Sequence, residues 1–99
     1  MIRGTTPTLR FVLPFSVDLL DAVYVTVTQD GEKVLEKTLE DCVKDENALS
    51  FRLTQEDTLE LEDGKWVEIQ MRAKMKSGEA VASQIERTAV HRILKDGVI

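Results

Sequence analysis

The chain has 99 residues and a mass of 11.2 kDa, which predicts one domain, residues 1–99, with no room for a second core. Its 42% hydrophobic and 31% charged residues indicate a folded globular protein, and its net charge of −5 disfavours nucleic acid and anionic membranes as partners. One cysteine and one histidine exclude an intramolecular disulfide and a histidine-rich metal site.

The N-terminal region alternates apolar and polar residues with a period of two, the pattern of a half-buried β-strand. Thr8–Leu13 fits this pattern, with Leu9 and Phe11 on one face, and Pro14 ends the strand because it lacks a backbone N–H. The residues before this strand, 1–7, form an N-terminal arm without the apolar run of a signal peptide. We therefore expect the chain to be made in the cytoplasm.

The next segments predict a β-hairpin. Residues 16–21 are expected to form a helical turn or an irregular crossing. Ala22–Thr28 is the clearest strand, because β-branched and aromatic residues fill almost every position and the valines lie on the face opposite Tyr24. Asp30-Gly31 is a strong hairpin signal, and the return strand, Lys33–Leu39, alternates imperfectly, which predicts an edge strand or a bulge.

The middle of the chain predicts two short strands and one helical turn. Cys42-Val43 is an apolar pair between charged residues, typical of a small edge strand, and residues 45–47 have turn chemistry. Leu49–Leu53 alternates and predicts another half-buried strand. Thr54 has the pattern of a helix N-cap, so Gln55–Leu59 is expected to form one short helical turn.

The last third predicts a second hairpin. Trp66–Met75 alternates along its whole length, with aliphatic side chains on one face and charged or polar ones on the other. A turn at 76–79 leads to a last strand over Ala80–Arg92, whose apolar residues change face, and a β-bulge near Arg87 would explain that change. Residues 93–99 follow as a C-terminal tail.

Six or seven strands and one helical turn favour an all-β sandwich or a small barrel over a helix-rich α+β fold. Residues 61–83 resemble the last hairpin of fibronectin-III-like domains: a leucine and a turn glycine, a long alternating strand, a glycine turn and a small-residue strand. They depart from that family where an aromatic residue, usually tyrosine, would lie within the long strand, since Trp66 comes earlier. The resemblance implies an immunoglobulin-like antiparallel β-sandwich of about seven strands with one short helical turn.

A second resemblance covers nearly the whole chain. Its opening Met1-Ile-Arg-Gly-Thr-Thr-Pro-Thr, the segment Leu53-Thr-Gln-Glu-Asp-Thr-Leu and the ending Ile93-Leu-Lys-Asp-Gly-Val-Ile resemble small prophage-encoded proteins of Gram-positive gut bacteria. These proteins are similar in size and strand pattern to β-sandwich modules of phage tails and baseplates. The resemblance implies a virion-associated or assembly role for a chain made in the bacterial cytoplasm, and it carries over no catalytic residue.

Chemistry-bearing residues are few. His91 is the only imidazole, and no serine and carboxylate are placed beside it, so we interpret it as a structural residue. Cys42 follows Glu40 and Asp41, which raise the pKa of its thiol, so we interpret it as a small core or edge residue. Acidic pairs such as Glu62-Asp63 lack the alternating spacing of a calcium loop, and no phosphate-binding or CxxC motif occurs. We predict no enzymatic activity, cofactor or metal.

Charge is unevenly spread along the chain. Residues 30–63 hold twelve acidic and four basic residues, a net of −8, whereas residues 64–99 hold four acidic and seven basic residues, a net of +3. The first interpretation is a set of solvated strand faces and loops. The second is that opposite charges guide copies of the chain, or another partner, into contact.

Two groups of residues are candidates for an interaction surface. Trp66 and Tyr24 point away from the valine face, so each either covers an end of the sandwich or contacts a partner. The second group lies in the tail, which either folds back or docks on another copy: Ile93, Leu94, Val98 and Ile99. We predict a phage structural module that binds itself or other phage proteins; the alternative is a glycan- or host-surface-binding module that uses the two aromatic residues.

Overall fold

The computed structural model describes residues 1–99, which form eight β-strands, two 3₁₀ turns and one short α-helix. The strands are β1 (Thr8–Val12), β2 (Leu20–Gln29), β3 (Glu32–Thr38), β4 (Val43–Asp45), β5 (Ala48–Arg52), β6 (Trp66–Met75), β7 (Ala80–Ala82) and β8 (Glu86–Ala89). The turns and helix are η1 (Val17–Leu19), η2 (Leu39–Asp41) and α1 (Gln55–Leu59). The all-β prediction and the single helical turn are therefore confirmed.

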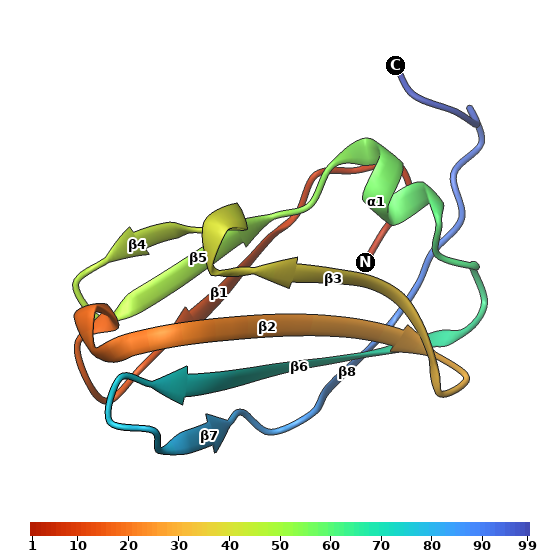
Figure 1. Cartoon of the computed structure of the whole chain (residues 1–99). Helices are drawn as coiled ribbons and strands as arrows, with labels where there is room; N and C mark the ends of the chain where they lie inside the picture. The colour runs from red at the N-terminus through yellow and green to blue at the C-terminus, as the bar shows by residue number, and fades with distance from the viewer.

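Two antiparallel sheets lie face to face (Figure 1). One has three strands in the order β1-β5-β4, and the other has five, with β3-β2-β6 followed by β7 and β8. Both β7 and β8 pair with β6, and because β2 occupies the other side of β6 along its length, they follow one another along a single edge. This two-layer arrangement confirms a β-sandwich-like architecture.

The core lies between the two sheets and comes from the residues predicted to face inward. Val23, Val25 and Val27 of β2 are fully buried, as the period of two requires. The facing sheet contributes Leu49 and Phe51, which are also fully buried. One continuous cluster of 14 buried apolar residues results, and burial of this apolar surface is the main driving force of folding.

The β2–β3 hairpin forms as predicted. Asp30 and Gly31 both have positive φ angles, 52° and 77°, which is the backbone of a two-residue type I′ turn. The register shifts between Val27 and Thr28, so β3 is both an edge strand and paired through a bulge. The imperfect alternation of its sequence has this physical cause.

The prediction of one continuous last strand over Ala80–Arg92 with a bulge near Arg87 is wrong in position. Arg87 pairs regularly with Glu68, and the interruption lies at residues 83–85. There the Ser83 hydroxyl accepts a hydrogen bond from the Met71 N–H at 3.0 Å, and the Ser83 N–H donates to the Met71 carbonyl at 2.8 Å. Because the serine side chain supplies the acceptor, the strand gains one residue without leaving that N–H unpaired.

The N-terminal arm is part of the folded domain. Ile2 forms a parallel bridge with His91, and the ammonium group of Met1 donates to the Ala89 carbonyl at 2.7 Å. The Arg3 guanidinium donates to the carbonyls of Leu59 and Leu61 at 3.0 and 2.7 Å, which pairs acceptors that the end of α1 leaves free. The first three residues therefore extend the sheet edge that β8 begins.

Helix α1 is held by a capping box. Thr54 accepts a hydrogen bond from the Asp57 N–H at 3.0 Å, and the Asp57 carboxylate accepts from the Thr54 N–H at 2.8 Å. Lys37, which points inward from β3, places its ammonium 2.9 Å from the same carboxylate. The helix is thus tied to the edge of the five-stranded sheet.

This carboxylate makes stability depend on pH. Burial raises the pKa of Asp57, but the Thr54 N–H and the Lys37 ammonium outweigh it and hold the pKa below its ordinary value of 3.8. Because the folded pKa is depressed, the stabilisation is present above pH 3.8 and is lost as pH falls through the folded pKa. We expect Asp57→Asn to lower the free energy of unfolding by about 1 kcal/mol at neutral pH, and by far less in acid, as measured by urea denaturation. Glu56→Gln, in the same turn without an ion pair, is the control; an equal loss at both pH values would contradict the assignment.

Candidate protein-interaction surface

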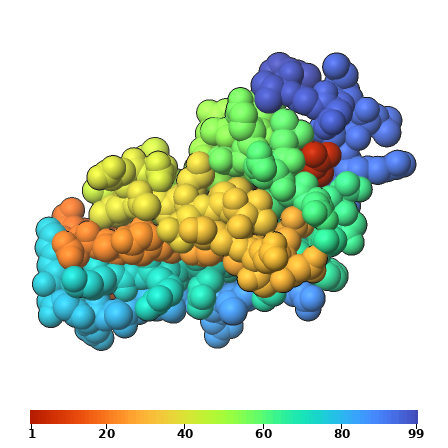
Figure 2. Space-filling view, turned by 45° about the vertical axis from the view of Figure 1, so that its right-hand side comes forward, coloured from red at the N-terminus to blue at the C-terminus, as the bar shows by residue number.

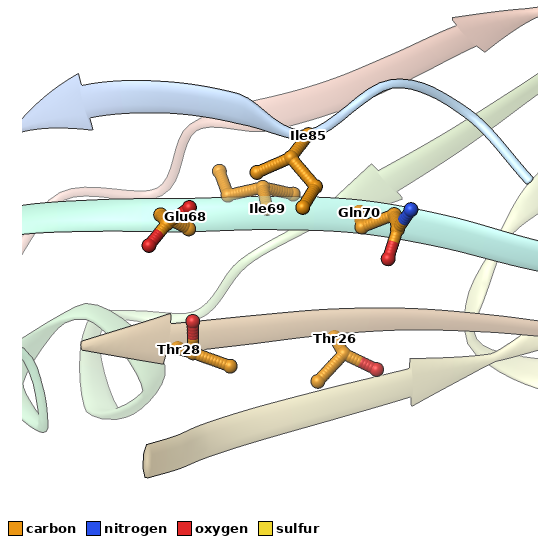
Figure 3. Close-up of a pocket in the computed structure, with 6 residues that line it drawn as sticks. All are labelled: Thr26, Thr28, Glu68, Ile69, Gln70 and Ile85. Atoms are coloured by element: carbon orange, nitrogen blue, oxygen red, sulfur yellow. The ribbon is translucent and has the colours of Figure 1, made fainter. Parts of the chain in front are cut away.

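Tyr24 and Trp66 both lie on the outer face of the five-stranded sheet, 48% and 54% exposed. They do not form one platform: Tyr24 pairs with Arg72, which is six residues, or about 20 Å, along β6 from Trp66. A hollow of about 240 Å³ lies between them, lined by Thr26, Thr28, Glu68, Ile69, Gln70 and Ile85. Figure 3 shows the two threonines on β2 facing Glu68 and Gln70 on β6, with Ile85 beside Ile69.

Trp66 borders a separate, polar hollow of about 470 Å³ at one end of the sheet. The Arg87 guanidinium lies 5.1 Å from the centre of its ring, a cation–π contact. In the same hollow, the Lys65 ammonium lies 2.8 Å from Asp30 and 2.7 Å from Glu62, and these carboxylates hold the pKa of Lys65 above its ordinary value. The indole therefore already has a cationic partner on one face.

The tail divides into a packed start and an uncovered remainder. Ile93 is half-buried beside Gly4, where an added Cβ would lie only 3.0 Å from the isoleucine and 3.5 Å from Leu59. Beyond it, Leu94 and Ile99 are 92% and 88% exposed, and Figure 2 shows the tail standing clear of the rest of the molecule beside α1. Of the four apolar side chains in the predicted cluster, only that of Ile93 is partly buried against the domain.

The backbone of the tail is almost without partners. No residue after His91 makes a backbone–backbone hydrogen bond. Ile99 is held by the Gln55 side chain, whose amide accepts from its N–H at 2.9 Å and donates to its carbonyl at 3.2 Å. Asp96 adds one weak contact, 3.8 Å from the Arg3 guanidinium. Hydrogen-bonding capacity at residues 93–98 is therefore unused.

The residues that could act in catalysis or bind a metal do not come together in one site. His91 is exposed, and its backbone, not its imidazole, joins the N-terminal arm to the sheet. Cys42 packs against the core, as expected; burial raises the pKa of its thiol, Asp41 adds to this effect and Lys44 opposes it. No group of three or more histidine, cysteine or acidic side chains is arranged to hold a metal ion. No helix is both long and apolar enough to cross a membrane.

The free edge of β1 is the feature that sequence reasoning did not locate. The Leu13 N–H donates to Asn47 at 2.7 Å and the Pro7 carbonyl accepts from Leu53 at 2.9 Å, so the odd-numbered residues of this segment bond to β5. Because bonding direction alternates along a strand, the N–H and C=O groups of the even-numbered residues point away from the sheet. These residues are Thr8, Arg10 and Val12.

Each other sheet edge carries a feature that hinders pairing with a further strand. Lys37 on β3 and Lys44 on β4 lie opposite buried residues, so each places a charge on the inner face of an edge strand. The β7–β8 edge is interrupted at Ser83 and continued by the N-terminal arm. Only β1 has five regularly paired residues and apolar side chains, Leu9 and Phe11, on its inner face.

The same edge leaves the core open. Leu9 and Phe11 are half-buried, although their partners on β5, Phe51 and Leu49, are fully buried. A strand added beside β1 would cover these side chains and pair the six free backbone groups. Comparison with known proteins adds nothing to this geometry, because no family model, curated protein or solved structure matches the chain.

Proposed function

We propose that this chain is a non-catalytic structural or assembly module of phage origin that acts through protein–protein contacts. Its partners would be copies of itself or other phage structural proteins, and it would be made in the bacterial cytoplasm and carried in the virion. The observation that carries the proposal is the free edge of β1, which lacks the protection present on every other edge. The exposed apolar tail is a second unpartnered segment on the same chain.

An immunoglobulin-like fold is part of this proposal. In such sandwiches one sheet contains strands A, B, E and D, and the other contains G, F and C with additional C strands. The order β1-β5-β4 matches B-E-D, and β3-β2-β6 followed by β7 and β8 matches C′-C-F-G, with β7 and β8 as halves of one interrupted strand. In this assignment strand A is absent from the side of β1, which accounts for its free edge.

The phage origin rests on the resemblance of the opening, central and final segments to prophage-encoded proteins, given above. The structure adds that each of these segments contributes to one end of the molecule. The N-terminal arm binds α1 through Arg3, and the tail is held to α1 through Gln55. The resembling segments thus lie at the end of the molecule that carries the exposed tail.

The glycan-binding alternative has weaker support. A sugar-binding groove needs exposed aromatic rings that converge, but Trp66 lies about 20 Å along β6 from Arg72, the residue that pairs with Tyr24 of β2. One face of the Trp66 indole is also covered by Arg87. We therefore favour assembly.

Self-association is the expected result of size-exclusion chromatography with light scattering on the full chain. The apparent mass should rise with protein concentration, because two segments lack partners within one copy. It should fall at high salt if the acidic residues 30–63 and basic residues 64–99 of different copies attract one another. A mass equal to one chain at every concentration would count against assembly from copies of this chain.

A further inference from the structure

We propose that the free edge of β1 receives residues 93–99 of a second copy as an added antiparallel strand. This inference rests on the assembly role proposed above and specifies its surface and partner. One segment offers three N–H and three C=O groups with no partner; the other lies outside any helix or strand, exposes Leu94, Val98 and Ile99, and makes no backbone–backbone hydrogen bond. Strand addition would satisfy both segments through the same bonds.

Charge complementarity sets the register. Arg10 is the middle residue of β1 and lies on the outer face; Asp96 is the middle residue of the tail 93–99, whose only other charged residue is Lys95. Opposite charges directly across an antiparallel pair are stabilising and like charges are destabilising. If β1 instead paired with β1 of another copy, centred on Arg10, the two arginines would lie directly opposite each other and repel. The tail is therefore the better partner for β1.

The same register matches the apolar side chains on the outer face. With Asp96 opposite Arg10, Leu94 lies opposite Val12, which is 67% exposed in the single chain. Val98 lies opposite Thr8, and β-branched cross-strand pairs are favourable. One alignment therefore satisfies the charged pair and covers exposed valine and leucine side chains together.

The inner face accepts the remaining tail residues. Gly97 lies opposite Leu9, and Lys95 lies opposite Phe11 in this alignment. The aliphatic part of a lysine can cover an apolar surface while its ammonium stays in water, so Lys95 would add cover to the half-buried Phe11 ring. The tail thus closes the side of the core that β1 leaves open.

The donor is a second copy because the antiparallel alignment does not fit within one chain. It places Ile93 beyond Val12, at the far end of β1, whereas Ile93 packs against Gly4, ahead of the near end. The strand is about 17 Å long, and His91 is fixed to Ile2 only two residues before Ile93. Each copy would give its tail to one neighbour and receive a tail from another, which produces rings or filaments.

Charge reversal tests the register on the full chain. Arg10→Asp and Asp96→Arg should each weaken self-association about tenfold in light scattering, and the double variant should restore most of it. Asp96 also lies 3.8 Å from Arg3 of its own chain, so Asp96→Arg alone could weaken association by disturbing that contact. Adding Arg10→Asp cannot repair the Arg3 contact, so restored association in the double variant would show that residues 10 and 96 pair with each other. Val12→Pro is a further test: it removes an outward N–H, spares the bonds to β5 and should abolish association while leaving the folded circular dichroism spectrum intact.

Amide hydrogen exchange separates the outcomes. The proposal expects protection of the Thr8, Arg10 and Val12 amides that increases with concentration and is absent when residues 93–99 are deleted. Association that is insensitive to tail deletion and to both reversals would overturn this inference while leaving the assembly role standing. A chain that stays monomeric at every concentration overturns this inference and, with it, assembly from copies of this chain. Protection that does not vary with concentration would mean that the tail pairs with β1 of its own chain, which also overturns the proposal.

Discussion

Phe51→Ala should lower the free energy of unfolding by about 3–5 kcal/mol, the largest effect we expect from a single substitution. Phe51 is fully buried at the centre of the three-stranded sheet and belongs to the set of largest buried side chains. Its ring meets that of Phe11 edge to face, with centroids 6.0 Å apart. Truncation removes this contact and leaves a cavity that the surrounding β-strands cannot close. The midpoint of thermal unfolding should fall by more than about 10 °C.

Phe11→Ala is the matched control, because it removes the other ring of the same pair. Phe11 is half-buried on the edge strand β1, so its truncation leaves a site that water can enter, and the loss should be clearly smaller. Urea denaturation of the two variants, compared with Phe51→Leu, measures the difference. Equal losses for Phe51→Ala and Phe11→Ala would mean that the core is as closed at β1 as at β5, against the geometry described here.

The strands that the sequence predicts best are those buried on one face along their whole length. β2 and β6 pair with each other over most of their residues, so every second side chain meets the core along β6 and from Val23 onward in β2; the register shift between Leu20 and Ala22 interrupts the alternation before that point. The cap at Thr54 and the turn at Asp30-Gly31 can also be predicted from the sequence, since each depends on residues within four positions. Interactions between neighbouring residues determine these elements.

The features that the sequence does not reveal depend on distant residues. The position of the bulge at Ser83 requires knowledge of the Met71 N–H that its hydroxyl binds. The sequence predicts residues 1–7 only as an N-terminal arm, because nothing near them in the chain shows that Met1 reaches Ala89. No alternation pattern links residues 88 positions apart.

The candidate site shows the same division. The tail was identified from its own composition, and most of its apolar side chains are exposed. The free edge of β1 could not be assigned, because freedom of an edge is a property of the sheet order and not of the strand. Its flanking residues, Pro7 and Pro14, indicate only that the strand is short; neither shows which side of β1 lacks a neighbour.

Gln29→Leu should lower the free energy of unfolding by about 2–3 kcal/mol, the second largest effect we expect. Gln29 ends β2 and is buried, an unusual place for an amide side chain. It donates to the Glu62 carbonyl and accepts from the Glu62 N–H, both at 2.9 Å. Leucine would leave these two backbone groups without partners and would release the loop that joins α1 to β6.

Gln55→Leu provides the control, since Gln55 makes the same pair of hydrogen bonds to the backbone of Ile99 at an exposed site. Water can replace those bonds, so the loss in urea denaturation should stay within about 0.5 kcal/mol. The two variants remove the same side chain and the same kind of paired bonds to a backbone, at a buried site for Gln29 and at an exposed site for Gln55. If both substitutions lower the free energy of unfolding equally, burial does not determine the size of the loss. A much larger loss for Gln29→Leu would show that water cannot replace the lost bonds to Glu62 and that this loop is fixed to the sandwich. The tail, whose bonds to Gln55 water can replace, would then lose little free energy on leaving its own helix for another chain.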